Sequence, residues 1–280
     1  MPRSENAQLS VDLYEKLRRD HNWSSDEAWK GIARLLLTCK RWIGKGFGWQ
    51  DFHGVVVYRE TNDFGHKQDG EPNATLRRGH DLNRYLAEQL SIEEDEVCKE
   101  IAQYWGQPEI EELQPHNLVG NAFRSIVVNI LETYGDSEID YYEEVNPHNL
   151  FPGHDFSSRS KDPRIDIVAK RRDRVVALIS SRWSLRHDRV EVIEEAREYR
   201  RAASQRCKYY PVMGEFDIAR LEKVLKNAPP RMSNPAINAA VHFAPQLITE
   251  GIDASNEQES EERLRHLKDL DFLIQETHSW

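Results

Sequence analysis

Two runs of the sequence, RIDIVAK (residues 164–170) and RVVALISSR (residues 174–182), contain a carboxylate, a hydroxyl and a cation at spacings that suit chemistry on phosphate. Asp166 is flanked by two isoleucines, so on a strand it points to the face opposite theirs, and Ser180 and Arg182 share one face. Such a group suits phosphodiester cleavage, in which carboxylates hold Mg²⁺ and a cation stabilises the charge on phosphorus. A simple salt bridge between Asp166 and Arg182 has the same spacing, so the spacing leaves both interpretations open.

The next segment, Arg186-His187-Asp188-Arg189, has the side chains that read base pairs. An arginine fork bonds O6 and N7 of guanine in the major groove, and an aspartate accepts from the N4 amine of cytosine. A two-fold dimer would read both halves of a palindrome. A helix N-terminus favours acids over arginines, so helix capping explains only Asp188.

The elements that would position these side chains follow from the hydrophobic pattern. The two β-rich runs, separated by a short polar turn, predict a hairpin. An amphipathic helix (117–135) and a loop rich in His, Pro and Gly (146–163) precede the hairpin, and the segments after it alternate: helical 188–203, strand-like 208–216, helical 217–227, strand-like 236–243 and helical 261–274. This alternation predicts an α/β fold with a mixed β-sheet flanked by helices.

Residues 1–115 read as a mainly helical N-terminal domain, so we expect one domain over 1–115 and a second over 116–280. Residues 86–102 have the apolar spacing of a helix-turn-helix, but the second helix begins with the four acids of residues 93–96. Because these carboxylates would repel phosphates, we interpret the segment as ordinary helix packing.

The composition is that of a globular protein, with 39% hydrophobic and 31% charged residues. Three widely spaced cysteines without a CxxC pair, and no apolar run of membrane-spanning or signal-peptide character, predict a cytoplasmic protein that does not enter a membrane. The net charge of −10 is uneven, because residues 159–189 contain ten Lys or Arg and only four Asp. Such a basic band attracts phosphate locally, although arginines on a solvated hairpin would produce the same count.

These residues resemble the PD-(D/E)XK nucleases, in the NgoMIV- and BsaWI-like branch of type II restriction endonucleases that read CCGG cores. In that branch an Asp on the first strand is followed by Ser-x-Lys on the second, by Arg-x-Asp-Arg four residues further, and by a metal-binding Glu on the next helix. Asp166 matches the first carboxylate and Ser180 the serine, and Arg186, Asp188 and Arg189 match the reading block at its expected offset.

The chain departs from the pattern of that branch at three positions. The family's lysine is Arg182, which keeps the charge but cannot deprotonate to act as a general base. The expected glutamate position, fourteen residues after Arg182, is Ala196. Glu195 flanks the apolar stripe of this helix whereas Glu194 projects away, so Glu195 is the candidate metal ligand. Arg124 stands where relatives often have a glutamate.

The resemblance covers roughly residues 115–280 and implies a restriction-endonuclease-like core that cleaves double-stranded DNA with Mg²⁺ at a palindrome with a CCGG core. It implies a catalytic set of Asp166, Ser180, Arg182 and Glu195, with metal held by Asp166 and Glu195. A homodimer or higher homo-oligomer and a cognate DNA methyltransferase are implied by the family alone.

Two alternatives stay open at this stage. One is a catalytically weakened or inactive sequence-specific DNA-binding protein on the same scaffold, which would shift duplex DNA without cutting it. The other is an unrelated α/β enzyme or interaction module, whose binding to duplexes would lack the steep salt dependence of phosphate contacts. No P-loop, HExxH, GxSxG or Gly-rich dinucleotide turn competes with these readings.

Overall fold

A computed structural model describes two long stretches of the chain after residue 114 and several shorter ones. The described residues are 15, 19, 93, 115–156, 163–182, 185, 191–203, 207–215, 218–229, 235–243, 245, 264 and 266–280. For residues 115–122, 218 and 219 only the backbone is described.

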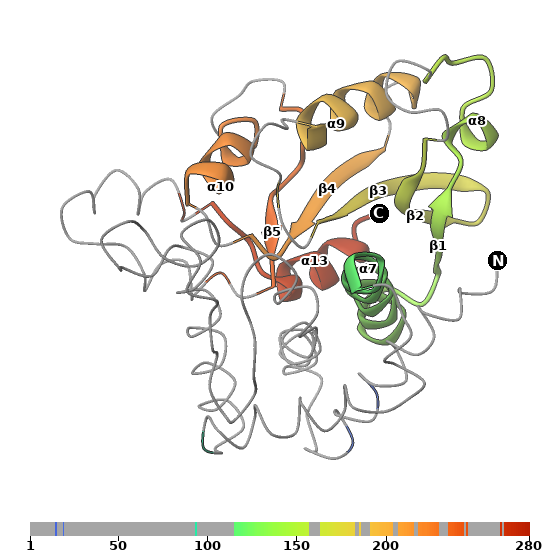
Figure 1. The fold of residues 1–280 in the computed structure, drawn as a ribbon. Coiled ribbons are helices and arrows are strands. Elements are labelled where there is room, and N and C mark those ends of the chain that lie inside the picture. Colours follow the sequence, from blue (N-terminus) through green and yellow to red (C-terminus); the bar gives the residue numbers. More distant parts are fainter. Residues whose placement is uncertain are drawn as a thin grey trace. The chain divides into compact units, whose positions relative to one another are not determined.

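A five-stranded mixed sheet is the centre of the described structure (Figure 1). Its strands lie in the order β1 (Ile139–Val145), β2 (Ile165–Arg171), β3 (Arg174–Arg182), β4 (Lys208–Met213) and β5 (Val241–His242). The first three strands pair antiparallel, and β3, β4 and β5 pair parallel. The described helices are α7 (Pro115–Tyr134), α8 (Pro147–Leu150), α9 (Glu191–Ala202), α10 (Ile218–Leu225) and α13 (Leu270–Thr277). The predicted α/β fold with a mixed sheet and flanking helices is confirmed.

The predicted hairpin is formed by β2 and β3. Arg171 pairs with Arg174 across a two-residue turn, and Arg172 in that turn has a left-handed backbone (φ 57°). Sequence analysis assigned no element to the residues of β1, which pairs with β2 at the edge of the sheet. In the structure, alternate residues from Ile139 to Val145 are more buried than those between them, as expected of an edge strand with one face covered.

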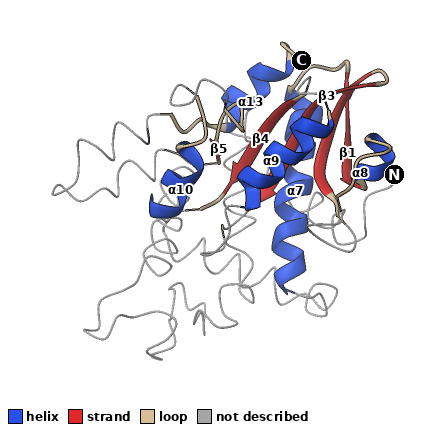
Figure 2. Cartoon of the chain, turned by 90° about the horizontal axis from the view of Figure 1, so that it is seen from above, coloured by secondary structure: helices blue, strands red, loops and turns tan. Residues whose placement is uncertain are grey.

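Helices cover both faces of this sheet (Figure 2). In Figures 1 and 2, α9 lies over one face, and α13 and the C-terminal part of α7 lie over the opposite face. Alternation along β3 and β4 sends Leu178 and its partner Tyr209 toward α9, and Ile179 and Tyr210 toward α13. The apolar core on the α9 side includes Val168, Leu178, Val192, Ile193, Ala196, Tyr199, Tyr209, Leu221, Val224 and Leu225. Each buried Val, Leu or Ile side chain contributes about 1.5–3 kcal/mol by leaving water, so this core holds α9 and α10 against the sheet.

The end of the chain differs from the sequence-based expectation. The strand predicted over 236–243 is reduced to the two residues of β5, and the helix predicted over 261–274 does not continue through residues 266–269. Lys268 has extended backbone, donating to Ala240 O (2.9 Å) and accepting from His242 N (2.7 Å). Asp269 then caps α13, accepting from the N–H of Phe272 at 2.8 Å. Lys268 completes the sheet edge, and the helix begins after it because Asp269 supplies the missing acceptor.

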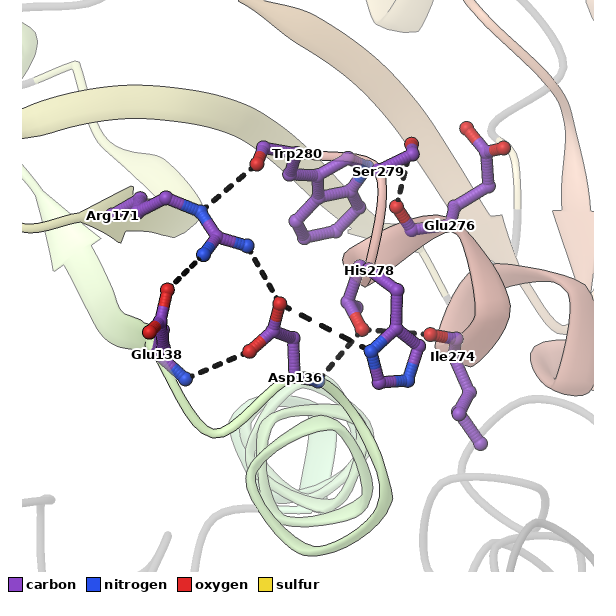
Figure 3. Close-up of polar contacts among 9 residues, drawn as sticks. Asp136, Glu138, Arg171, Ile274, Glu276, His278, Ser279 and Trp280 are labelled. Carbon is purple, nitrogen blue, oxygen red and sulfur yellow. Dashed lines mark hydrogen bonds and ion pairs between the residues drawn. The ribbon is translucent and has the colours of Figure 1, made fainter.

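A polar network fastens the C-terminal end of α13 to the hairpin (Figure 3). Arg171 donates to Asp136 Oδ2 (2.6 Å), to Glu138 and to the main-chain oxygen of Trp280 (2.9 Å). The N–H of Asp136 donates to Thr277 Oγ1 at 2.8 Å. The N–H of Glu138 and the Arg171 guanidinium hold the pKa of Asp136 below its usual range. The network therefore depends on Asp136 being ionised.

The chain divides within α7 into two compact units, with the boundary between residues 123 and 124. The predicted domain boundary after residue 115 stays a prediction, and the predicted helical N-terminal domain lies almost wholly outside the described residues. Among the described helices, none combines the length and the apolar character that crossing a membrane requires.

We expect Asp136→Asn to lower the free energy of unfolding at neutral pH. A carboxyl with a depressed native pKa stabilises the fold above its unfolded pKa, and this contribution disappears as pH falls through the native value. The difference in the free energy of unfolding between wild type and Asp136→Asn should therefore vanish at a pH well below 3.8, the ordinary pKa of Asp. Urea unfolding at a series of pH values measures it, with exposed Asp140→Asn as the matched control. An Asp136→Asn penalty that persists in acid would contradict the account.

Candidate functional site

The β2–β3 hairpin brings Asp166 and Ser180 together. Ser180 Oγ donates to Asp166 Oδ2 at 3.2 Å, and the N–H of Ser181 donates to the same oxygen at 2.9 Å. Asp166 is half-buried and Ser180 is buried. The two hydrogen bonds fix the orientation of the carboxylate, because a backbone N–H and a hydroxyl hold one of its oxygens from the neighbouring strand.

Arg182, at the end of β3, lies between two carboxylates. Its Nε donates to Ser180 Oγ (3.0 Å) and lies 3.8 Å from Asp166 Oδ2, and its Nη2 donates to Glu195 Oε2 at 2.9 Å. The charge of Asp166, opposed by burial and aided by the charge of Glu195, raises the pKa of Arg182 further above its usual range. The guanidinium is therefore a permanent cation with about a third of its side-chain surface (35%) still exposed.

Glu195 reaches this group from α9. The helix buries Val192, Ala196 and Tyr199 against the sheet, and Glu195 is buried beside them while Glu194 is exposed. Glu195 therefore lies on the side of α9 that the sequence predicts. Its role as a metal ligand stays a prediction. A buried carboxylate costs several kcal/mol unless a cation and hydrogen bonds compensate it, and Arg182 supplies both.

Tyr209 belongs to the same group and was missed by sequence analysis. It lies on β4, next to β3, and its side chain is buried against Leu178 in the core. Burial first, and then the negative charge of Glu195, raise its pKa well above the usual value. Its hydroxyl is therefore a neutral neighbour of the Arg182–Glu195 pair. The sequence gives little sign that Tyr209 lies at this site, because an aromatic residue in a buried strand most often only packs in the hydrophobic core.

Two carboxylates, Asp166 and Glu195, both lie beside the guanidinium of Arg182, and they are the candidate ligands for a divalent cation. Within the part of the chain that the structure describes, no three His, Cys, Asp or Glu side chains are grouped to hold a metal ion. Mg²⁺ commonly uses one or two carboxylates with waters and substrate phosphates, so the pair fits the donor set of that ion. In this chain the ion would share both carboxylates with the guanidinium of Arg182.

The predicted reading residues Arg186, Asp188 and Arg189 lie outside the described residues. The residue before them, Leu185, is described: its N–H donates to Glu215 Oε2 at 2.8 Å, and its carbonyl accepts from Arg220 Nη1 at 2.8 Å. Sequence analysis gave Glu215 and Arg220 no role. Nothing in the sequence connects them with Leu185, since they follow it by 30 and 35 residues.

Arg124 on α7 forms ion pairs with two glutamates of β1. Its Nε donates to Glu143 Oε2 at 3.0 Å and its Nη1 to Glu144 Oε1 at 2.8 Å, and Ser125 also donates to Glu143. Glu143 is the cross-strand partner of Ile167, so its side chain lies on the face opposite Asp166. Arg124 therefore supports β1 rather than joining the group around Arg182.

No protein-family model matches the chain, and no curated protein matches it. A search of solved structures finds a similarity to the complex of the restriction endonuclease PspGI with its substrate DNA. The TM-score is 0.39 and the sequence identity 11%, over 99% of this chain and 95% of that chain.

We expect Glu195→Gln to lower the free energy of unfolding by about 1–3 kcal/mol, because it leaves Arg182 without its buried partner while Arg182 keeps some contact with water. Denaturant unfolding measures the loss. Glu194→Gln, which removes the same charge from the exposed side of α9, should change stability by no more than about 0.5 kcal/mol. Equal effects of the two substitutions would contradict the described pairing.

Proposed function

We propose that this protein is a type II restriction endonuclease that hydrolyses phosphodiester bonds of duplex DNA with the help of Mg²⁺. The observation that carries the proposal is the convergence of Asp166, Ser180, Arg182 and Glu195 at one end of the β2–β3 hairpin. Two acids and a permanent cation at one point match the needs of a phosphodiester whose negative charge grows during hydrolysis.

In the proposed mechanism Asp166 and Glu195 would hold Mg²⁺, which would supply Lewis-acid activation when bound. Ser180 and the N–H of Ser181 keep Asp166 oriented. Arg182 binds a non-bridging phosphate oxygen and stabilises the charge that develops there. It cannot take a proton from water, since its pKa is raised further by the neighbouring carboxylates.

Recognition in this proposal belongs to Arg186, Asp188 and Arg189, which directly precede α9 in the sequence. The arginines would bond guanine edges and the aspartate a cytosine amine, giving a CCGG core when two copies act about a two-fold axis. A homodimer, and a DNA methyltransferase that protects the host's own sites, follow from the same proposal.

A second candidate is a sequence-specific DNA-binding protein that does not cut. The observation that favours it is the position of Arg182, whose guanidinium already bridges the carboxylates that a metal needs. Incubating supercoiled plasmid with the protein and Mg²⁺ separates the two. Discrete linear fragments support the endonuclease, and a gel shift of duplex DNA without cleavage supports the second candidate. Absence of both cleavage and salt-dependent binding rejects both candidates.

We expect Asp166→Asn to reduce the rate of plasmid cleavage by about a hundredfold or more, because losing a metal ligand removes several kcal/mol of transition-state stabilisation. Duplex binding in Ca²⁺, measured by gel shift, should persist, since a negative charge near phosphate has been removed. Exposed Asp140→Asn is the matched control and should cleave at the wild-type rate. Unchanged cleavage by Asp166→Asn would rule out this site.

We expect Arg182→Lys to raise the cleavage rate by about tenfold or more, because a lysine can release a proton and occupies less of the space between the carboxylates. Single-turnover cleavage of plasmid DNA measures the change. Arg182→Gln removes the charge altogether and should cleave more slowly than wild type. If both variants cleave at the same rate, the cation at this position has no part in the reaction.

A further inference from the structure

Tyr209 on β4 has a buried hydroxyl group without a hydrogen-bond partner in the part of the chain that the structure describes. The residue is only 1% exposed, and its ring packs in the apolar core on the α9 side of the sheet. Buried hydroxyls are normally hydrogen-bonded, because losing water without gaining a new partner costs free energy. An exception therefore needs an explanation, and a role in catalysis or in ion binding is one of the known explanations.

The hydroxyl of Tyr209 lies beside the groups around Arg182. Tyr209 pairs with Leu178 of β3, so its side chain shares a face of the sheet with Ser180, two residues further along β3. Helix α9 covers that face, with Glu195 buried on the side toward the sheet (Figure 2). Burial raises the pKa of Tyr209 well above its usual value, and the charge of Glu195 raises it further. The charge of Arg182 and the nearby hydroxyl of Ser180 oppose this rise, although the Ser180 contact does not reach hydrogen-bond geometry.

The backbone of Tyr209 is fixed in place. Its N–H donates to Asn238 Oδ1 at 2.8 Å, and its carbonyl accepts from the N–H of Asn238 at 2.9 Å. Strand β4 pairs with β3 along its other edge. Because the ring is also enclosed by the core, the position of the hydroxyl relative to the end of β3 is set by the sheet.

In the proposed function Glu195 is a ligand of Mg²⁺, and this role conflicts with its bond to Arg182. Glu195 Oε2 accepts from Arg182 Nη2 at 2.9 Å, and a guanidinium repels a divalent cation bound to the same carboxylate. The Glu195 side chain is only 8% exposed, so bulk water does not readily replace the guanidinium as a donor. Carboxylates that bind metals are themselves hydrogen-bonded by neighbouring groups, which orient them. A neutral hydroxyl suits this task better than a second cation, because it does not repel the metal.

We propose that Tyr209 is a positioning residue for Glu195: its hydroxyl donates to the carboxylate in place of the Arg182 guanidinium when Glu195 binds a divalent cation. The inference rests on the proposed function, since it needs Glu195 to be a metal ligand. It adds to that function a donor that is neutral, already removed from water and fixed by the sheet. It also allows Arg182 to leave the carboxylate and bind a phosphate oxygen.

The test measures Mn²⁺ binding to the full-length protein by isothermal titration calorimetry, without DNA. Tyr209→Phe should weaken the affinity for Mn²⁺ by about tenfold, as expected when a metal-binding side chain loses a partner that orients it. Without metal, the same variant should unfold in urea at the wild-type midpoint or above it, because the deleted hydroxyl has no partner there. A tyrosine with a purely structural role would instead lower the midpoint and leave the affinity for Mn²⁺ unchanged.

Tyr210→Phe is the matched control at the next residue of β4. The hydroxyl of Tyr210 donates to Glu276 of α13, on the opposite face of the sheet. Its loss should lower the urea midpoint and leave the affinity for Mn²⁺ unchanged. The two substitutions therefore have opposite expected effects on stability and on metal binding.

A second measurement needs no metal. In an Arg182→Met background Glu195 loses the guanidinium, and Tyr209 should donate to it instead. Tyr209→Phe should then lower the urea midpoint in that background, although it does not do so in the wild type. If Arg182→Met does not fold, the Mn²⁺ titration decides alone.

Tyr209→Phe with the wild-type affinity for Mn²⁺ overturns the inference and leaves the proposed function standing. A lower urea midpoint for Tyr209→Phe without metal, in the otherwise wild-type protein, shows a structural role for the hydroxyl and also overturns the inference. A wild-type protein that binds no Mn²⁺ overturns the metal-dependent function and the inference together.

Discussion

The guanidinium of Arg182 lies between the carboxylates of Asp166 and Glu195, and the local structure depends on that arrangement. Glu195 is buried on the face of α9 that packs against the sheet, where an uncompensated charge would cost several kcal/mol. The cation therefore fixes α9 to the end of β3 and pairs with an acid on each of two elements, β2 and α9. The same interaction brings together the groups on which the proposed phosphodiester hydrolysis rests.

Strand β3 is where the two kinds of pairing in the sheet meet. Its antiparallel partner β2 supplies Asp166, and its parallel partner β4 supplies Tyr209 and, just beyond its end, Glu215. Parallel strands end at the same edge, so the residues that follow β3 and β4 come together there. Arg182 and Leu185 are accordingly both bonded to the residues that follow β4, Arg182 to Gly214 and Leu185 to Glu215.

Much of the candidate site was predictable from the sequence because it is local. The period of two along a strand and a short turn are enough to place Asp166 opposite Ser180, and the apolar stripe of the following helix selects Glu195 over Glu194. That the acid of α9 would reach Arg182 was a weaker inference, since it depends on how the helix packs on the sheet.

The sequence by itself determined the hairpin, the face of each strand residue and the buried side of α9, since these follow from chain geometry over a few residues. Only the tertiary structure decided that Lys268 pairs beside β5, so that α13 begins at Leu270. It also decided that Glu215 and Arg220 form hydrogen bonds with Leu185. Those contacts join residues about 25 to 35 positions apart. They form only when the packing of the whole sheet stabilises the fold by more than the entropic cost of closing such loops.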